Sequence, residues 1–392
     1  MRILILHNRY QQAGGEDAVV SAEATLLHAH GHTVSVFDEN NDGIRRGIDA
    51  AQTAIRCVWS FDAHRSIGQR IVDFRPDVVH IHNFFPRLSP SVHHACRQAG
   101  IPVVQTLHNY RLLCPAATLL RDGKICESCV GKSFPWSAVQ HSCYHHSAAA
   151  SAAVANMLLF HRLCGTWSRT VTRFIALSQF ARDKFISAGL PADKMDVKPN
   201  FVVSDPGMSS ADEGYALFVG RLAPEKGIET LLEAWQHVGP GRVLRIVGDG
   251  PLAPAVRDAA LRNSSIEWLG RLDRPEVSRL MSAAAVLVFP SIWYEGFPMV
   301  IAEAFAAGLP VIGSCIGSIA EIVGDRETGL LFQSGCAAEL ASTVDWVFQH
   351  PLAMKAMRRN VRREFEARYS AEVNYTKLLG IYQAAGVPAL AH

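Results

Sequence analysis

The sequence contains no long hydrophobic run and no marked excess of charge of one sign. Its longest weakly polar stretch, residues 147–160, is mostly alanine and is shorter than the ~20 apolar residues that a membrane-spanning helix needs. Charged residues make up 19% of the 392 residues, and the formal net charge is +2. Because no overall positive field favours nucleic acid, we expect a chain that binds no nucleic acid and does not span a membrane.

The N-terminus lacks the pattern of a secretion signal. Its apolar run, residues 3–6, is too short for a signal peptide and leads directly into a strand pattern. The nine cysteines are an odd number, which favours reduced thiols over a disulfide framework. We therefore expect a cytoplasmic protein.

Three other patterns are absent. Residues 7–16 lack the three-glycine spacing of a dinucleotide fingerprint, so Asp38 after the second strand pattern is weak evidence for NAD. No Asp-x-Asp pair, the usual carboxylate clamp for a divalent cation, occurs in the chain. The absence of a fixed-period repeat and of low-complexity tracts argues against solenoids and propellers.

Short aliphatic runs alternate with helix-length amphipathic segments in two series. This alternation is typical of parallel βαβ units, and the length of the chain fits two domains. We expect an α/β fold with two Rossmann-like, doubly wound parallel sheets. The predicted strands lie at residues 3–6, 33–37, 77–81 and 103–107, and again at 215–219, 243–247, 266–269, 285–289 and 310–312.

The domain boundaries follow from composition. Ser, Asp, Pro and Gly concentrate at residues 203–214, which we interpret as a mobile interdomain linker. The last helical pattern, residues 354–385, is long enough to return toward the first domain. The expected divisions are residues 1–205, residues 206–370, and a C-terminal helix at residues 371–392.

Two cations follow the first strand of the second series. Arg221 and Lys226 stand between that strand and a helix, which is where open α/β sheets bind ligands. A diphosphate there would meet both cations and the positive end of the helix. The alternative is a solvated loop with ordinary surface charges.

A second motif, residues 290–303, runs from an apolar strand through a glycine turn into a helix. Gly296 permits close backbone approach, and a buried Glu303 needs a hydroxyl or cation partner, which the diol of a ribose supplies. The alternative for Glu303 is a helix carboxylate paired with a nearby arginine. The first N–H groups of the helix are free to bind sugar hydroxyls or phosphate, and we place them around Phe297, Pro298, Met299 and Val300.

With these motifs, residues 220–329 resemble the donor domain of the retaining family 4 glycosyltransferases, the glycosyl transferases group 1. That family has the GT-B fold, in which two Rossmann-like domains face a cleft. The resemblance implies that Arg221 and Lys226 hold the diphosphate of a nucleotide sugar, and that Glu295 contacts the transferred sugar. It also implies that Glu303 binds the ribose and that Leu272 offers backbone contacts to the base.

The first domain resembles the same family. Gly14 and Gly15 precede a helix and would approach the donor phosphates or the acceptor, and His108 ends the fourth strand, where the family places a histidine that faces the sugar. The alternative for His108 is a hydrogen-bonded histidine at a strand end. That alternative is stronger for His80 and His82, which alternate along one strand.

Further positions match the lining of the family's cleft. His82 and Asn83 are expected to border the acceptor side. Ser178 and Asn200 also match cleft positions, although a helix cap or a turn explains them equally well.

The resemblance implies a metal-independent enzyme without cofactors. It would move a sugar from a UDP- or GDP-sugar to a saccharide or lipid-linked acceptor with retention of configuration, in polysaccharide or glycoconjugate biosynthesis. A lipid-linked acceptor would place the chain at the inner face of the membrane, with residues 84–87 facing the bilayer. The alternatives are a GT-B-fold nucleotide-sugar epimerase or phosphorylase, and a noncatalytic nucleotide-sugar-binding protein.

Four cysteines lie in an insertion at residues 110–146, which directly follows His108. Four thiolates are able to close a structural zinc site, but their spacing is wider than in a compact zinc ribbon, and separately packed reduced thiols are the alternative. The cysteines are Cys114, Cys126, Cys129 and Cys143, and the positive charges expected beside the acceptor pocket are Arg111, Arg121 and Lys124.

Overall fold

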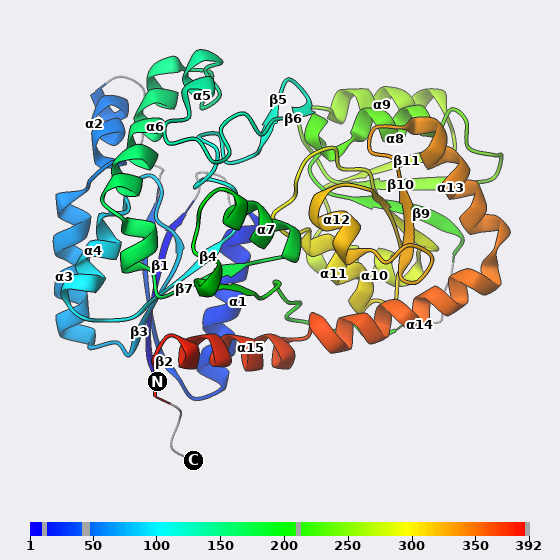
Figure 1. The fold of residues 1–392 in the computed structure, drawn as a ribbon. Coiled ribbons are helices and arrows are strands. Elements are labelled where there is room, and N and C mark those ends of the chain that lie inside the picture. The colour runs from blue at the N-terminus through cyan, green and yellow to red at the C-terminus, as the bar shows by residue number, and fades with distance from the viewer. Residues whose placement is uncertain (10–13, 41–47, 209–212, 389–392) are drawn as a thin grey trace. The chain divides into compact units, whose positions relative to one another are not determined.

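The computed structural model describes residues 1–9, 14–40, 48–208 and 213–388, and these form two compact units (Figure 1). Unit 1 comprises Met1–Arg121, Cys126–Pro199 and Asn374–His392. Unit 2 comprises Asp122–Ile125 and Asn200–Val373. The divisions at 199/200 and 373/374 fall a few residues from the expected 205/206 and 370/371.

Unit 1 is built on a six-stranded parallel sheet with the order β2-β1-β3-β4-β7-β8. Its central strands are buried on both faces, as the continuous aliphatic runs of a parallel sheet require; all six residues of β3 are buried. The strands are β1 (Arg2–Arg9), β2 (Thr33–Asn40), β3 (Val78–Asn83), β4 (Val103–Leu107), β7 (Arg173–Ala176) and β8 (Met195–Val197).

Helices cover both faces of this sheet. On one face, α1 (Gly15–Ala29) and α15 (Ala371–Ala384) share a core with β1, in which Leu27 and Leu378 pack near Ile3. On the other side lie α3 (Phe61–Phe74) and α4 (Ser91–Gln98), which contact each other (Figure 1). The remaining helices of the unit are α2 (Ile48–Arg56), α6 (Ala148–Leu163), η1 (Thr166–Thr170), α7 (Gln179–Ser187) and η2 (Ala192–Lys194).

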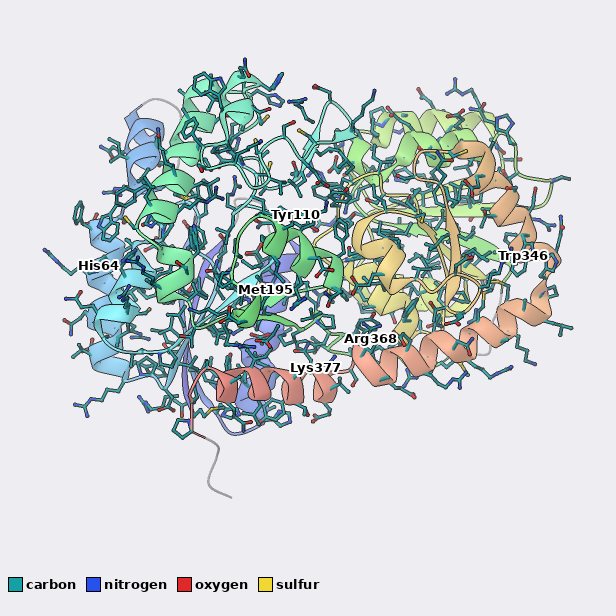
Figure 2. All side chains as sticks on the ribbon, in the orientation of Figure 1. His64, Tyr110, Met195, Trp346, Arg368 and Lys377 are labelled. Atoms are coloured by element: carbon teal, nitrogen blue, oxygen red, sulfur yellow. The ribbon has the colours of Figure 1, made fainter. Side chains whose placement is uncertain are left out.

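The insertion between β4 and α6 is largely irregular. It contains only the short strands β5 (Leu120–Arg121) and β6 (Lys124–Ile125) and the short helix α5 (Trp136–Gln140). Several non-glycine residues there have positive φ, including Ala117 at 66° and Leu119 at 50°. Backbone hydrogen bonds of turns, such as that from the Tyr110 amide to the Ala117 carbonyl at 3.1 Å, and the stacking of the Tyr110 ring on Phe185 stabilise the segment; Tyr110 is labelled in Figure 2.

Unit 2 is built on a second six-stranded parallel sheet, with the order β11-β10-β9-β12-β13-β14. Its strands are β9 (Tyr215–Val219), β10 (Val243–Val247), β11 (Ile266–Gly270), β12 (Val286–Phe289), β13 (Val311–Ser314) and β14 (Gly329–Phe332). Alternate residues of β9 enter opposite cores: Phe218 joins one and Leu217 the other. This alternation is the two-residue period of a strand.

Each core of unit 2 lies under its own set of helices. The Phe218 core is covered by α8 (Ile228–Ala234), α9 (Ala253–Arg262) and α13 (Ala337–Gln349). The Leu217 core is covered by α10 (Arg274–Ala283), α11 (Met299–Ala306), α12 (Gly317–Ile322) and α14 (Pro351–Arg368). The short helix η3 (Pro224–Lys226) precedes α8.

The expected α/β fold with two Rossmann-like parallel sheets is confirmed. All nine predicted strands are present, while β7, β8 and β14 were not predicted. In the described residues no helix is long and apolar enough to cross a membrane.

The predicted linker needs correction. Residues 209–212 lie outside the described residues, but the segment before them is anchored in unit 2. Arg362 on α14 donates two hydrogen bonds to the Asp205 carboxylate, at 2.6 and 2.7 Å. The Val202 amide donates to the Tyr369 carbonyl at 3.0 Å. These bonds hold residues 200–208 against α14, so this part is not a free linker.

Candidate functional site

Lys226 and Glu295, predicted from different motifs, form an ion pair in unit 2. The Lys226 Nζ lies 2.7 Å from Glu295 Oε1, and the Ser291 hydroxyl donates to the same oxygen at 2.7 Å. Ser318 donates to the Glu295 carbonyl at 2.9 Å. The carboxylate is buried and the ammonium is half-buried, so both groups are oriented in advance. The sequence motifs did not indicate either serine.

Gly227, between η3 and α8, explains how these two motifs approach each other. A Cβ added to Gly227 would lie 1.9 Å from the Pro290 carbonyl oxygen, and the glycine has a φ of +71°. Only glycine permits this contact of backbone on backbone. Lys226 is thereby held beside the end of β12, with its Nζ 5.4 Å from the centre of the Trp293 ring.

A second glycine pair supports the loop that carries Arg221. A Cβ on Gly248 would lie 1.9 Å from the Gly220 carbonyl oxygen, and one on Gly250 would lie 2.5 Å from the Leu222 carbonyl oxygen. The Leu222 amide donates to the Asp249 carbonyl at 2.9 Å. The two loops after β9 and β10 thus stack closely. The Gly-x-Gly spacing after a predicted strand was the signal that could have identified this contact.

Arg221 and the start of α11 offer unpaired donors. The side chain of Arg221 is exposed and makes no hydrogen bond or ion pair to any residue in the described ranges. The helix begins at Met299 rather than at Phe297, with Pro298 as its N-cap and no side-chain cap. Because proline has no N–H, the free amides are those of Met299 and Val300, which corrects the expected set.

Glu303 lies on α11 and is half-buried. Its carboxylate has no hydrogen-bond or ion-pair partner within the part of the chain that the structure describes. Burial raises the pKa of this carboxyl, while the charge of Arg274 acts in the opposite direction. The paired-arginine alternative is therefore not what the structure shows. Leu272 lies after β11, packed against the Leu217 core.

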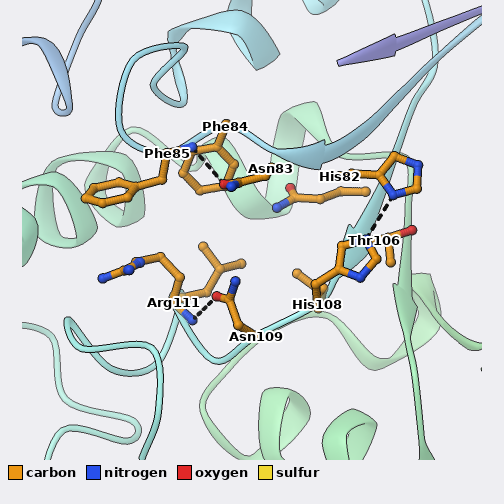
Figure 3. Close-up of a pocket in the computed structure, with 11 residues that line it drawn as sticks. His82, Asn83, Phe84, Phe85, Thr106, His108, Asn109 and Arg111 are labelled. Carbon is orange, nitrogen blue, oxygen red and sulfur yellow. Dashed lines mark hydrogen bonds between the residues drawn. The ribbon is translucent and has the colours of Figure 1, made fainter. Parts of the chain in front are cut away.

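Unit 1 contains a pocket at the ends of β3 and β4 (Figure 3). Asn83 Oδ1 accepts from the Phe85 amide at 2.9 Å, and Asn109 Oδ1 accepts from the Arg111 amide at 3.0 Å. His82 Nδ1 lies 2.9 Å from His108 Nε2. The structure therefore brings together His82 and Asn83, which were expected at the acceptor side, and His108, which was expected to face the sugar. The lining is completed by Phe84, Phe85, Gln105, Thr106, Leu107, Arg111 and Leu112.

A buried cluster of polar side chains lies behind this pocket. The Glu23 carboxylate is 3.0 Å from His80 Nδ1, 3.2 Å from His82 Nε2 and 3.0 Å from Lys198 Nζ. Glu23 was not singled out from the sequence, because a glutamate within an amphipathic helix gives no signal of its own. Burial lowers the pKa of His82 to about 4, and the neighbouring His80 acts in the same direction. Burial and the neighbouring His82 also hold the pKa of His108 well below its usual value.

The predicted Gly14, Gly15 and Ser178 of unit 1 lie at helix N-termini, and the predicted Asn200 is the first residue of a segment of unit 2. Gly14 is the N-cap of α1 and its amide donates to Asp17 Oδ2 at 2.8 Å, while Gly15 begins the helix. Asp38 pairs with Arg9 at 2.6 Å. Ser178 caps α7 by accepting from the Ala181 amide at 3.1 Å. The Asn200 side chain is buried.

The proposed bilayer contact of residues 84–87 is wrong for its aromatic side chains. Phe84 and Phe85 are buried, at 4% and 5% exposure. The guanidinium of Arg111 lies 4.3 Å from the centre of the Phe85 ring and 4.9 Å from that of Tyr144. Buried rings that pack in the unit cannot enter a membrane interface.

The four cysteines of the insertion are free thiols. Burial raises the pKa of Cys129 to about 11, and the thiols of Cys114, Cys126 and Cys143 add to the effect, so the four lie near one another. Sulfurs around zinc lie about 3.8 Å apart. Among the described residues, no three of these cysteines have their sulfurs within 4.8 Å of one another, and the zinc site and the separately packed thiols stay the two alternative predictions for them.

Two family models match adjoining parts of the chain. Residues 13–205 match the family Glycosyltransferase Family 4, and residues 206–364 match the family Glycosyl transferases group 1. An uncharacterised glycosyltransferase of Methanocaldococcus jannaschii is 32% identical over 166 residues, 42% of this chain and 46% of the relative. A phosphatidyl-myo-inositol mannosyltransferase of Mycobacterium leprae is 29% identical over 258 residues, 61% of this chain and 66% of the relative. The chain spans a little under half of the first curated relatives it matches, 46% and 42% of their lengths.

Solved structures show the same fold. HepE of Anabaena, solved in complex with UDP, superposes with a TM-score of 0.68 at 19% identity, covering 98% of this chain and 100% of that one. A sucrose-phosphate synthase of Thermosynechococcus elongatus superposes with a TM-score of 0.71 at 18% identity, covering 97% of this chain and 98% of that one. Both support the GT-B fold expected from the sequence. Since the two family models together extend from residue 13 to residue 364, the chain belongs to the group 1 and family 4 glycosyltransferases.

Proposed function

We propose that the chain transfers a sugar from a UDP- or GDP-sugar to a saccharide or lipid-linked acceptor, with retention of anomeric configuration. The proposal places the reaction in polysaccharide or glycoconjugate biosynthesis. It is supported by the family, by a mannosyltransferase among the relatives and by the UDP bound in the HepE structure.

The observation that carries the proposal is the half-buried carboxylate of Glu303, which has no protein partner among the described residues and lies in the same unit as two cations. A half-buried carboxylate without a partner in the described residues costs free energy, which a ligand with two hydroxyl donors would recover. A ribose diol is such a ligand. Lys226 and Arg221 then supply the positive charge that its diphosphate needs.

In this proposal the departing nucleoside diphosphate is stabilised by Lys226, Arg221 and the free amides of α11. No divalent cation is required, because these fixed charges take its place. Glu295, held by Lys226 and Ser291, contacts the transferred sugar. The pocket of unit 1 that contains His108 takes the sugar or acceptor hydroxyls.

The direct test is thermal stabilisation of the full chain by UDP, GDP, ADP and the corresponding nucleotide sugars. A ligand that binds the native state at 100 times its Kd stabilises it by about 2.7 kcal/mol. We expect a rise in Tm with one nucleoside diphosphate family, lost in Glu303→Ala and Arg221→Ala. The exposed Glu229→Ala is the matched control. Absence of a shift with every nucleotide would refute the donor site.

Product analysis then tests the transfer itself. Incubation with the stabilising nucleotide sugar and a mixture of saccharide and polyprenyl-phosphate sugar acceptors should yield a glycoside whose anomeric configuration equals that of the donor. An inverted product would overturn the retaining mechanism. Binding without turnover in every mixture would favour a sensor.

A further inference from the structure

The buried cluster behind the pocket of unit 1 is a series of close polar contacts that ends at His108. It begins at Lys198, whose ammonium contacts Glu23 Oε2 and Asn374 Oδ1, both at 3.0 Å. It continues through Glu23 Oε1 to His82 Nε2 at 3.2 Å, and through His82 Nδ1 to His108 Nε2 at 2.9 Å. Figure 3 shows the last of these contacts, between the two rings.

The donor and acceptor roles of these groups can be assigned one after another, starting from Lys198 at the buried end of the series. An ammonium only donates, so Glu23 Oε2 accepts from Lys198. The carboxyl is ionised, so Oε1 is a negative oxygen: burial acts to raise the pKa of Glu23, but the ammonium of Lys198 acts in the opposite direction and the pKa lies well below its usual value. The contact between Oε1 and His82 Nε2, 3.2 Å, lacks hydrogen-bond geometry, but it favours a proton on Nε2, because a ring lone pair there would be repelled by the negative oxygen. A neutral imidazole has one donor and one acceptor, which leaves its Nδ1 to accept.

The same reasoning fixes the next ring. Since His82 Nδ1 accepts, the proton between the rings belongs to His108 Nε2. The other nitrogen of His108, Nδ1, then carries a lone pair, and it makes no hydrogen bond to any residue that the structure describes. His108 lines the pocket.

We propose that Glu23 and His82 are positioning residues that hold neutral His108 with its proton on Nε2 and its lone pair on Nδ1. The lone pair makes His108 a hydrogen-bond acceptor for a hydroxyl of the molecule in the pocket. That this molecule is a sugar rests on the proposed function. The tautomer itself does not.

A metal ion is the other reading of this cluster. The ligand atoms of Glu23, His80 and His82 lie within 4.8 Å of one another. However, Lys198 already supplies a positive charge at the carboxylate, and a cation beside this ammonium would be repelled. His80 also has other partners, Tyr382 and Thr106, each at 2.8 Å. The ammonium of Lys198 therefore supplies the positive charge at this carboxylate that a metal ion would otherwise bring.

Other titratable groups surround the chain and leave its roles unchanged. His80 of β3 and Tyr382 of α15 face Glu23. His7 of β1 faces both His82 and His108. His7 is itself paired with Asp17 at 2.7 Å and burial lowers its pKa. None of these groups places a second acceptor between His82 and His108.

The substitution Glu23→Gln keeps the size and shape of the side chain. It should nevertheless exchange the donor and acceptor roles of the groups from residue 23 to His108. The amide oxygen has to face Lys198, so the amide NH₂ takes the place of Oε1 and donates to His80 Nδ1 and His82 Nε2. His82 then carries its proton on Nδ1 and donates to His108 Nε2. The proton of His108 moves to Nδ1, and its acceptor becomes a donor.

The tautomers can be read from long-range ¹H–¹⁵N correlation spectra of the full chain labelled with ¹⁵N-histidine at neutral pH, without nucleotide. Signals are assigned with His108→Gln and His82→Gln. We expect protonated Nε2 on His108 in the wild type and protonated Nδ1 in Glu23→Gln. Glu127→Gln, which removes a glutamate paired with Lys184 at 2.6 Å, should keep the wild-type pattern. A wild-type His108 protonated on Nδ1 overturns the proposal, even if the variant does not fold.

Two further measurements separate this inference from the proposed function. Elemental analysis should find no stoichiometric metal ion in the wild-type protein. One bound ion per polypeptide that is lost in Glu23→Gln would show that Glu23, His80 and His82 bind a metal, and would refute the proposed tautomer. In transfer assays Glu23→Gln should lower kcat about 10- to 100-fold, the effect of losing and opposing one hydrogen bond, with less than a twofold change in nucleotide Kd. An unchanged kcat in the variant would refute the role of the tautomer. Failure of nucleotide binding in the wild type would refute the proposed function alone.

Discussion

The ammonium of Lys226 lies 2.7 Å from the carboxylate Oε1 of Glu295. The cation that we assign to the donor diphosphate is thus already neutralised by the carboxylate that we assign to the transferred sugar. A bound diphosphate has to share this ammonium with Glu295. Ground-state binding is weakened by that competition, whereas departure of the diphosphate and contact with the sugar use both groups.

The first prediction follows from this competition. Glu295→Gln should strengthen binding of the nucleoside diphosphate about fivefold, because removing one negative charge near the site is worth ~1 kcal/mol. It should lower the rate of transfer about 100-fold, a typical loss for an oriented polar group at the reacting centre. Calorimetric titration measures the first effect and a product assay the second. Glu229→Gln, on an exposed position of α8, should change neither, and weaker diphosphate binding in Glu295→Gln would contradict the assignment.

The second prediction concerns Glu303. Because burial raises the pKa of this carboxyl, its charged form destabilises the free protein at neutral pH. Glu303→Gln should therefore raise the Tm of the free protein, by about 2–4 °C if the cost is ~1 kcal/mol. It should weaken nucleotide binding at least about tenfold, as expected for hydrogen bonds to a charged group. A thermal scan with and without nucleotide measures both effects. If Glu303→Gln without ligand has a lower Tm than the wild type without ligand, groups of the protein stabilise the carboxylate.

The third prediction tests the packed glycine loops of unit 2. Gly248→Ala should destabilise the protein by more than about 3 kcal/mol, because its Cβ would lie 1.9 Å from the Gly220 carbonyl oxygen. Gly241→Ala is the matched control, since Gly241 also has a positive φ, +76°, but open space around it. Backbone strain alone costs about 1–2 kcal/mol there. Similar losses in the free energy of unfolding would rule out the steric explanation.

The fourth prediction is the pH dependence of stability. Burial lowers the pKa of His93 to about 4, below its ordinary value of about 6.5, although the hydrogen bond with Gln105 at 2.9 Å acts in the opposite direction. The unfolded chain therefore takes up this proton at a higher pH than the folded chain. Stability is full above pH 6.5 and is lost as the pH falls from about 6.5 to about 4.

A substitution isolates this contribution. His93→Gln should flatten the fall in unfolding free energy by up to about 1.4 kcal/mol per pH unit, the value for one proton. Urea titrations at pH 7, 6, 5 and 4.5 measure the slope. His28→Gln, at a solvent-exposed position, should keep the wild-type slope. A slope that is unchanged by His93→Gln would show that other groups dominate.

The fifth prediction concerns metal removal. Transfer should persist in excess EDTA, since we assign the charge of the donor diphosphate to Lys226 and Arg221. Rates with and without Mg²⁺ or Mn²⁺ measure this directly. A rate restored only by a divalent cation would refute metal independence. A fall in Tm on chelation, with loss of zinc, would instead show that the four cysteines close around zinc when it is present.

The strand pattern and the two donor-site motifs were readable in the sequence because their signals are local. A buried parallel strand is an aliphatic run, and the strand, turn and helix around Glu295 follow one another within a few residues. The features that we did not predict are those for which a short stretch of sequence gives no clear signal. Helix α11 begins at Met299, two residues later than expected, because the local pattern does not determine at which of several neighbouring residues a helix begins. Strand β8, of three residues, is too short for a periodic signal.

Which polar side chains contact each other depends on the tertiary structure and could not be predicted from the sequence. Glu23 and Lys198 are 175 residues apart in sequence, and nothing near either of them predicts a partner. They meet because the parallel strands β1, β3, β4 and β8 bring their neighbouring segments to one sheet, while α1 and α15 pack over the same face. The sequence thus determined the two sheets and the location of the two polar motifs of unit 2 through local patterning. The state of His108 depends on contacts that exist only once the first sheet has assembled and has excluded water from Glu23.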